Sequence, residues 1–314
     1  MSNEELRPEE FAQAAEAAIT DALTRQDPRA MAEVLAQAGL CGVMAAEDDG
    51  GLGLDLAFAL PIAQAAGRLR LPLPLPEQIL LASALAGTPQ AAALAAGERL
   101  AGIAWQGSLQ SGHARLDNGP ADWVLVADGD GAALVDASAQ PRDEQGALDP
   151  EQPQTWIALE GATVLARLDG QAWRALQRQA HLLLAEYANG AAEGALQAAA
   201  DYMATRVQFG RPLSAKQAVR HLLARMRLLQ DVSSAAIRRA TRTDEYGASR
   251  DTQPALAGAL SNAAFVIEKA IHLHGGMGFT WELPLHRALR AVRKLDTAFA
   301  GLSRDAGRAF IQRV

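Results

Sequence analysis

A long hydrophobic repeat is the feature that most constrains the fold of this 314-residue chain. Between residues 173 and 202, apolar side chains recur every three or four positions, at Trp173, Leu176, Ala180, Leu183, Tyr187, Ala191, Ala195, Ala198 and Tyr202. This spacing keeps one face of an α-helix apolar, and such a helix extends about 45 Å at 1.5 Å per residue. The repeat therefore predicts one unusually long helix that packs against other helices along most of its length.

Three further helices follow in the last third of the chain. Their apolar positions are Val219, Leu222, Leu223, Met226, Leu229 and Val232 in the first, Leu256, Leu260, Ala263, Ile267, Ala270 and Ile271 in the second, and Leu289, Val292 and Leu295 in the third. The small residues at these positions let helices approach closely. We therefore predict a C-terminal four-helix bundle over residues 169–314.

The first hundred residues, 1–100, have the pattern of helices joined by turns. Asp27–Pro28 is a helix start, with Asp27 as the N-cap and proline in the first helical position. The glycine-rich segment 46–53 predicts a turn, and another helix follows near 56–68. The segment 71–76 contains three prolines and predicts extended chain, because each proline restricts the residue before it.

The middle of the chain changes character and predicts a small β domain over 101–168. Two apolar runs flank a turn of alternating Asp and Gly, which is typical of a β-hairpin. The four expected strands are Trp123–Val126, Ala133–Val135, Trp156–Leu159 and Ala162–Leu165. The polar segment 137–155 is expected to be loop. The fold class is thus α+β and mainly α, with an N-terminal helical domain, a middle β domain and a C-terminal bundle.

Composition excludes several classes of protein. The formal charge is −7 and the pI is about 5.4, so nucleic acid is not an expected partner. A single cysteine, Cys41, excludes an internal disulfide framework and a cysteine-cluster metal site, and it fits a reducing compartment. No signal-peptide pattern and no membrane-span length of apolar residues is found. We expect a cytoplasmic protein.

One corner of the bundle carries residues suited to an anion. The long helix is expected to end before Arg206–Pro212, where Gly210 and Pro212 prevent its continuation, and Gln217 starts the next helix. An arginine beside a helix N-terminus is a common arrangement for binding phosphate. The same residues would also suit a helix C-cap with a solvated arginine, and spacing does not decide between the two.

A second candidate is the glycine-rich segment that follows the third bundle helix. Gly275 and Gly276 would let a ligand or another backbone come close. A helix precedes them rather than a strand, which excludes a dinucleotide-binding Rossmann turn. His272 and His274 are alternate residues on a helix, so they point apart and no metal site is expected.

Taken together, these segments resemble the acyl-CoA dehydrogenase family. Ala46–Gly53 is similar to its P-E-x-x-G-G-x-G turn, Arg206–Gln217 to its R-x-x-F-G…Q signature, and His274–Thr280 to its G-G-x-G-F signature. The order of helical domain, β domain and bundle is the same. The resemblance implies a flavoprotein that removes the α and β hydrogens of an acyl-CoA thioester, using a carboxylate base and the flavin of FAD.

The resemblance also implies roles for individual residues in binding FAD across a subunit interface. Arg206 would pair with the pyrophosphate of FAD whose flavin lies on the neighbouring subunit. The remaining contacts would come from Gln208, Phe209, Gln217, His272, Gly275 and Gly276. Family members usually carry Gln at the position of His272. An electron-transfer flavoprotein-type acceptor is the implied redox partner.

The chain departs from the family at the catalytic base. The two positions at which the family carries a catalytic Glu align with Ala180 and Phe299, and neither is acidic. The nearest acids are Glu186, roughly 9 Å along the helix from Ala180, and Asp296, three residues before Phe299. Asp296 is therefore the candidate base if this chain has one.

The flavin side also departs from the family. Where the family has an A-x-T-E-P-type strand, this chain has Ala104–Ser108, which lacks the Thr-Glu-Pro core. The chain therefore resembles the short subunits of heteromeric bacterial acyl-CoA dehydrogenases, some acting on steroid side-chain thioesters, in which a longer partner supplies the base. The alternatives are a self-sufficient homo-oligomeric dehydrogenase with Asp296 as base, and a non-catalytic acyl-CoA-binding or scaffold protein.

Overall fold

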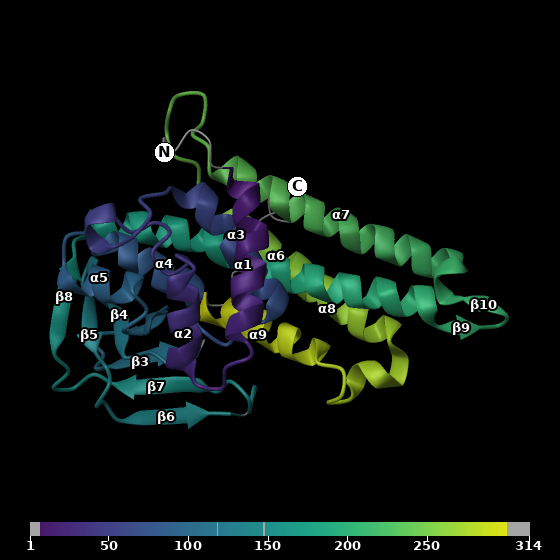
Figure 1. Ribbon diagram of the computed structural model, residues 1–314, viewed down its shortest axis with the longest axis horizontal. Coiled ribbons are helices and arrows are strands. Elements are labelled where there is room, and N and C mark those ends of the chain that lie inside the picture. The colour runs from purple at the N-terminus through teal and green to yellow at the C-terminus, as the bar shows by residue number, and fades with distance from the viewer. Residues whose placement is uncertain (1–6, 118, 147, 300–314) are drawn as a thin grey trace. The chain divides into compact units, whose positions relative to one another are not determined.

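The computed structural model shown in Figure 1 describes residues 7–117, 119–146 and 148–299. The chain divides into two compact units: unit 1 comprises Met1–Ala66 and Leu71–Leu183, and unit 2 comprises Gly67–Arg70 and Leu184–Val314. Two helices, α3 (Leu56–Leu69) and α6 (Gly170–Thr205), start in unit 1 and end in unit 2. The mainly helical α+β fold class is confirmed. The division into three domains, with boundaries at 100 and 168, stays a prediction.

Helices dominate the first part of unit 1. They are α1 (Pro8–Ala22), α2 (Pro28–Gln37), the start of α3, α4 (Leu75–Ala84) and α5 (Pro89–Ala95). The predicted start of α2 is confirmed, since the Asp27 carboxylate accepts a hydrogen bond from the Ala30 amide at 3.0 Å. Thr88 caps α5 in the same way through the Ala91 amide at 3.3 Å. Each cap satisfies an amide that the helix itself leaves unpaired.

The prediction of extended chain over 71–76 is wrong at its end. Helix α4 begins at Leu75 and takes Pro76 into its first turn, where a proline costs no hydrogen bond. Every residue from Leu75 to Ala82 is buried. A helix buried on all sides shows no polar stripe, so the sequence pattern does not reveal it.

The glycine-rich turn at 46–53 is a closely packed loop. It contains one 3-10 turn, η2 (Glu47–Asp49), followed by Gly50 and Gly53 with φ of 78° and 61°. A side chain on Gly51 would clash, because its Cβ would lie 2.2 Å from the Ala45 carbonyl oxygen. The absence of regular α-helix here is as predicted, and the glycines serve close packing of the backbone.

Two four-stranded sheets form the β part of unit 1. The first has the order β1-β4-β5-β8 and the second β2-β3-β7-β6, and all neighbours are antiparallel except β1 and β4. The strands are β1 (Ala101–Ala104), β2 (Gln106–Ser108), β3 (His113–Leu116), β4 (Trp123–Asp128), β5 (Gly131–Asp136), β6 (Arg142–Gln145), β7 (Gln154–Ala158) and β8 (Val164–Leu168). The predicted hairpin is confirmed as β4–β5, with Gly129 at φ 63° in its turn.

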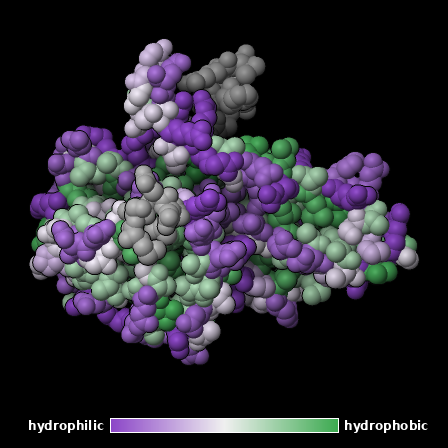
Figure 2. Space-filling model, turned by 45° about the horizontal axis from the view of Figure 1, so that its top comes forward, coloured by the Kyte–Doolittle hydropathy of each residue, from purple (hydrophilic) through white to green (hydrophobic). Residues whose placement is uncertain are grey.

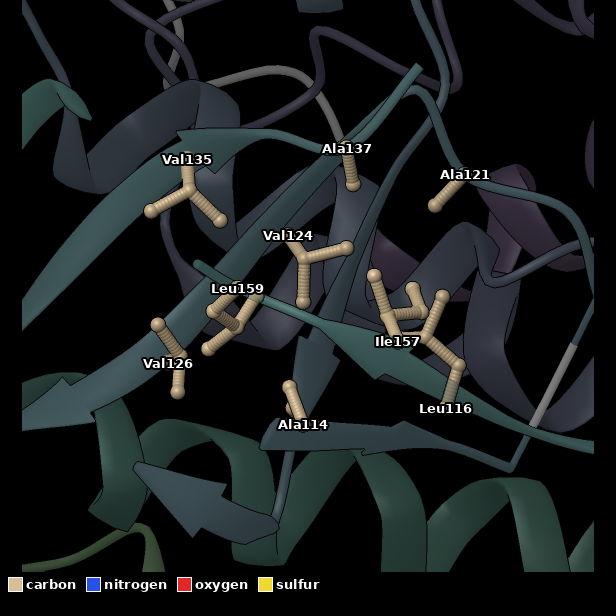
Figure 3. Packing of buried hydrophobic residues seen from close by; sticks show 10 residues of the cluster. Ala114, Leu116, Ala121, Val124, Val126, Val135, Ala137, Ile157 and Leu159 are labelled. Carbon is tan, nitrogen blue, oxygen red and sulfur yellow. The ribbon is translucent and has the colours of Figure 1, made fainter. Parts of the chain in front are cut away.

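The two sheets share one hydrophobic core (Figure 3). Alternate residues of β4 and β5 face alternate residues of β3 and β7, so one side of each sheet is dry. The side chains that meet there are Val124, Val126 and Val135 from the first sheet and Ala114, Leu116 and Ile157 from the second.

The loop predicted over 137–155 contains a strand. Residues Arg142–Gln145 form β6 at the edge of the second sheet, and all four are exposed. Edge strands often carry charged residues because these discourage pairing with other chains. The strand therefore lacks the apolar alternation on which a sequence-based prediction depends.

Unit 2 is built on the bundle helices α6, α7 (Gln217–Ala240), α8 (Gln253–Leu273) and α9 (Leu285–Ala298). The four predicted helices are therefore confirmed. Asp169 caps the first turn of α6 through the Ala172 amide at 2.8 Å. Polar side chains join the helices, since the buried Asn189 donates to the half-buried Ser234 at 2.8 Å and the half-buried Asn262 donates to the buried Ser233 at 3.0 Å.

The end of α3 is held in unit 2 by close backbone contact with α6. A Cβ on Gly67 would lie 1.9 Å from the Tyr187 carbonyl oxygen, and a Cβ on Gly194 would lie 2.9 Å from the Arg68 carbonyl oxygen. Arg70 follows with a left-handed φ of 57° and donates to the Pro284 carbonyl at 2.8 Å. Glycine at 67 is thus required by space.

We expect Gly67→Ala to lower the free energy of unfolding by about 3 kcal/mol, because a backbone carbonyl cannot yield as a side chain can. The matched control is Gly258→Ala in α8, where a Cβ meets nothing within 4 Å. The control should raise stability by up to about 1 kcal/mol through helix propensity. Urea denaturation measures both, and equal stabilities for the two variants would contradict the close contact.

Candidate functional site at the α6–α7 end of the bundle

The predicted anion corner forms a short hairpin arm after α6. Strands β9 (Val207–Gln208) and β10 (Arg211–Pro212) pair antiparallel, and the Arg206 carbonyl accepts from the Leu213 amide at 2.9 Å. The arm lies at the end of α6 in Figure 1. Helix α6 ends at Thr205. The prediction that Gly210 ends this helix is therefore wrong. Gly210 forms the hairpin turn instead.

The turn of the arm places an aromatic ring in a strained position. Phe209 and Gly210 have φ of 55° and 76°, which is the requirement of a two-residue hairpin loop. A left-handed conformation costs a non-glycine residue roughly 1–2 kcal/mol. The Phe209 side chain is 88% exposed, and the Lys216 ammonium lies 5.0 Å from its ring centroid. A strained and exposed aromatic residue is typical of a binding surface.

The predicted polar ligands of the arm face solvent. The side chains of Arg206, Gln208 and Gln217 are exposed. No residue in the described part of the chain accepts a hydrogen bond or forms an ion pair with the Arg206 guanidinium. Gln217 begins α7, as predicted, after a short 3-10 turn, η3 (Leu213–Ala215), that follows the arm. The corner therefore offers an unneutralised cation beside a helix N-terminus, which suits an anion.

A ring stack joins this arm to the glycine-rich segment. His274 ends α8, and its ring lies 4.6 Å from that of Tyr202 on α6, with an angle of 16° between the planes. The His274 Nδ1 is 2.8 Å from the Ala270 carbonyl oxygen. Since Tyr202 is four residues before Arg206 and His274 is one before Gly275, the stack brings the two predicted segments together. Sequence reasoning missed this contact.

The glycine segment itself is open. It forms a 3-10 turn, η4 (Gly275–Phe279), and Gly275 has a left-handed φ of 61°. A Cβ on Gly275 or Gly276 would meet nothing within 4 Å, so both backbones are accessible. His272 is exposed on the last turn of α8, whereas His274 is buried. The two histidines point apart, as predicted.

The positions aligned with the family base carry no acid. Ala180 is fully buried on α6, and Phe299 is the C-cap of α9. Asp296 lies on α9 and is buried, and its role as a base stays a prediction. Within residues 7–117, 119–146 and 148–299, no group of three or more His, Cys, Asp and Glu side chains could hold a metal ion.

Glu186 is the buried acid of α6. Burial raises the pKa of its carboxyl group to about 7, although a hydrogen bond from Asn189 and the charge of Arg238 act in the opposite direction. Its Oε2 has no hydrogen-bond partner among the described residues. The charged form of this group therefore destabilises the fold.

A pair of indole rings lies in unit 1 beside the segment that departs from the family. Trp105 stacks on Trp173 of α6 with centroids 6.0 Å apart and 17° between the ring planes. Trp105 stands between β1 and β2. Segment 104–108 therefore contributes one ring of a packed aromatic pair at the place where the family resemblance implies Thr, Glu and Pro.

Comparison with known proteins agrees with this geometry. Residues 174–303 match the model of the acyl-CoA dehydrogenase C-terminal domain. The chain is 31% identical to the acyl-CoA dehydrogenase IpdE2 of Mycobacterium tuberculosis, over 80% of this chain and 76% of that protein. It is also 31% identical to the acyl-CoA dehydrogenase FadE34 of the same organism, over 86% of this chain but only 40% of FadE34.

Solved structures show the same fold. The ChsE4-ChsE5 complex of Mycobacterium tuberculosis matches with a TM-score of 0.80 and 22% identity, over 97% of each chain. A Tcur3481-Tcur3483 steroid ACAD variant matches with a TM-score of 0.77 and 25% identity, over 96% of each chain. The chain belongs to the acyl-CoA dehydrogenase family, and at family level it is an oxidoreductase. It is similar to the short subunits of heteromeric members of that family. No helix in the described ranges is long and apolar enough to cross a membrane.

The strain at Phe209 predicts opposite effects for two substitutions. Phe209→Asn should stabilise the arm, because asparagine tolerates the left-handed region, and Phe209→Val should destabilise it, because a β-branched residue does not. Amide hydrogen exchange of peptides covering 206–213 should slow about fivefold in the first and accelerate about fivefold in the second, which corresponds to about 1 kcal/mol each. The same change in both variants would refute a left-handed Phe209.

The raised pKa of Glu186 predicts a pH-dependent stability. The folded state holds this proton up to about pH 7, whereas the unfolded chain releases it near its ordinary value of 4.5. Stability from this group therefore falls as pH rises from 4.5 to 7 and is constant above 7. The free energy of unfolding of Glu186→Gln, relative to that of wild type, should therefore rise by about 2 kcal/mol from pH 5 to pH 8.

Urea denaturation at the two pH values measures this difference. Glu245→Gln, in the exposed loop between α7 and α8, is the matched control and should leave the pH dependence of wild type intact. A Glu186→Gln variant whose stability follows the wild-type pH profile would show that Glu186 is ionised in the folded protein.

Proposed function

We propose that this chain is the short subunit of a heteromeric acyl-CoA dehydrogenase and contributes half of an FAD site to a longer partner. The main support for this proposal is the corner at the end of α6. There Arg206 is exposed without a counter-ion among the described residues, and the Tyr202–His274 stack joins the arm to Gly275 and Gly276. An exposed cation and an open glycine backbone suit a pyrophosphate and an adenosine.

The chain's own residues would hold the FAD pyrophosphate and adenosine in separate ways. Arg206 would donate charge-assisted hydrogen bonds to the pyrophosphate, Phe209 would pack against the cofactor, and Gln217 would hydrogen-bond it. Gly275 and Gly276 would admit the adenosine, with His272 at their edge. When bound, FAD supplies a flavin that takes the β hydride of the acyl thioester.

Two features of the chain support a partner for the chemical step. Ala180 and Phe299 cannot abstract a proton, and a base must reach the acyl α carbon. Trp105, which stacks on Trp173, lies in the segment that the family uses beside the flavin. The two similar structures, a ChsE4-ChsE5 complex and a Tcur3481-Tcur3483 steroid enzyme, support a two-chain assembly and a steroid side-chain thioester as substrate. An electron-transfer flavoprotein-type acceptor would reoxidise the flavin.

Loss of FAD from the assembled complex tests the proposal. Arg206→Ala should weaken FAD binding roughly 10- to 100-fold, the value of a charge-assisted hydrogen bond. FAD titration of the apo complex, followed by flavin absorbance, gives the dissociation constant. Arg174→Ala, an exposed arginine at the start of α6, is the control and should bind FAD as wild type does.

Other outcomes are equally informative. Unchanged FAD affinity in Arg206→Ala would overturn the half-site. If the chain purified alone holds one FAD per subunit and turns over an acyl-CoA, it is a self-sufficient homo-oligomeric enzyme, and Asp296→Asn then tests the remaining candidate base.

A further inference from the structure

The arm and α7 form a strongly basic segment in an acidic chain. Between residues 206 and 243 there are nine Lys and Arg residues and one acid, Asp231, which gives a net charge of +8. Because the whole chain carries −7, the rest carries −15. The cations are Arg206, Arg211, Lys216, Arg220, Arg225, Arg227, Arg238, Arg239 and Arg242, and all except the half-buried Lys216 are exposed.

Little of this positive charge is neutralised within the protein. Arg227 pairs with Asp231 at 3.1 Å, and Arg225 lies over the Phe265 ring at 4.7 Å. Arg220, Arg239 and Arg242 form no ion pair with any residue that the structure describes. The excess charge is therefore available to a partner.

The same helix exposes an apolar stripe. Leu228 and Val232 are 61% and 49% exposed and lie one helical turn apart, and the exposed Ala224 and Ala235 extend the stripe in both directions. Side chains that are buried in unit 2 occupy the opposite side of α7, namely Met226, Gln230, Ser233 and Ile237. Figure 2 shows hydrophobic surface interleaved with hydrophilic surface on the right, the side on which helices α6, α7 and α8 extend in Figure 1.

The spacing of this outer face suits another helix. Apolar positions separated by three, four and seven residues form a ridge, and alanines at its ends let a second helix approach to about 8–10 Å. Nucleic acid would use the cations but would leave Leu228 and Val232 in contact with phosphate or water. The combination of an apolar centre with a basic surround therefore favours a protein.

Charge also decides which protein. In a two-fold contact each copy presents the same patch, so two α7 helices of this chain would place their cations against each other. Like charges brought together in a desolvated contact cost several kcal/mol. An amphipathic helix with acidic flanks would instead satisfy both the stripe and the cations.

We propose that the outer face of α7 is a docking surface that selects a non-identical subunit with an acidic helical face and disfavours pairing with a second copy of this chain. This inference rests on the proposed function, because it identifies the partner that completes the FAD half-site. The surface is separate in its residues from that half-site, which uses Arg206, Phe209 and Gln217.

Co-expression with each full-length acyl-CoA dehydrogenase chain of the source organism tests the inference. Native mass spectrometry reports the assembly, and biosensor titration reports the dissociation constant between 50 and 500 mM salt. We expect the chain alone to be monomeric and one of these probes to bind it. Arg220→Glu/Arg239→Glu and Leu228→Glu should each raise the dissociation constant at least tenfold, and salt should raise that of wild type.

The matched control is Arg25→Glu/Arg174→Glu, a double charge reversal at exposed arginines outside α7, which should change the dissociation constant less than twofold. The inference fails if the chain alone forms a dimer that Leu228→Glu dissociates, or if a probe binds the α7 variants as tightly as wild type. It also fails if no probe binds, or if a random-sequence DNA duplex binds through Arg220 and Arg239 and no protein probe does.

FAD titration of the same complexes separates this inference from the proposed function. If the α7 variants leave the dissociation constant of the complex unchanged but Arg206→Ala weakens FAD binding, only the docking surface is overturned. A complex that depends on α7 but keeps FAD in Arg206→Ala overturns only the half-site.

Discussion

The unbroken backbone hydrogen bonding of α6 is the constraint on which the other features depend. This one helix of 36 residues contributes Trp173 to unit 1 and Tyr202 to unit 2. Its small residues are as important as its large ones, because Gly194 leaves room for the Arg68 backbone and thereby holds the end of α3. A helix that admits other backbones this closely cannot shift in register without losing several contacts at once. The arm and its root at Tyr202 are therefore carried on a rigid support.

That rigidity has a functional consequence for the candidate site. A stack between Tyr202 and His274 fixes the spacing between two loops that are about seventy residues apart in sequence, and neither loop contributes a buried hydrophobic anchor of its own. Binding residues held by a rigid scaffold need little reorganisation when a ligand arrives. The exposed Arg206 and the open Gly275–Gly276 backbone are therefore held in place before a ligand binds, because the structure beneath them is already packed.

The sequence predicts the elements that have a one-sided hydrophobic pattern and misses those that lack one. All four bundle helices and the β4–β5 hairpin carry such a pattern. Helix α4 is buried all round, and β6 is exposed all along, so neither shows the alternation between polar and apolar faces that the prediction requires.

The tertiary contacts could not be predicted from the sequence for a different reason. The Tyr202–His274 stack and the contact of Gly67 with Tyr187 join residues that are distant in sequence, and local periodicity carries no information about such pairs. The motif resemblance identified Arg206, Gln217 and the glycines as one group, but only the structure shows which contact joins them. Their roles toward FAD stay predictions, as does the role of Asp296.

The charge of α7 adds a reason for the chain to need a partner that differs from itself. Burial of Leu228 and Val232 against another protein would be favourable by hydrophobic area alone, whichever chain supplied the surface. The surrounding arginines make the choice of partner matter. The free energy lost by desolvating them beside like charges exceeds the free energy gained by burying the exposed parts of two aliphatic side chains. Specificity thus follows from a repulsive element placed around an attractive one. Under the proposed function, a subunit without an acidic residue at either family base position would benefit from such selection, because pairing with itself would place no acid at either of these positions.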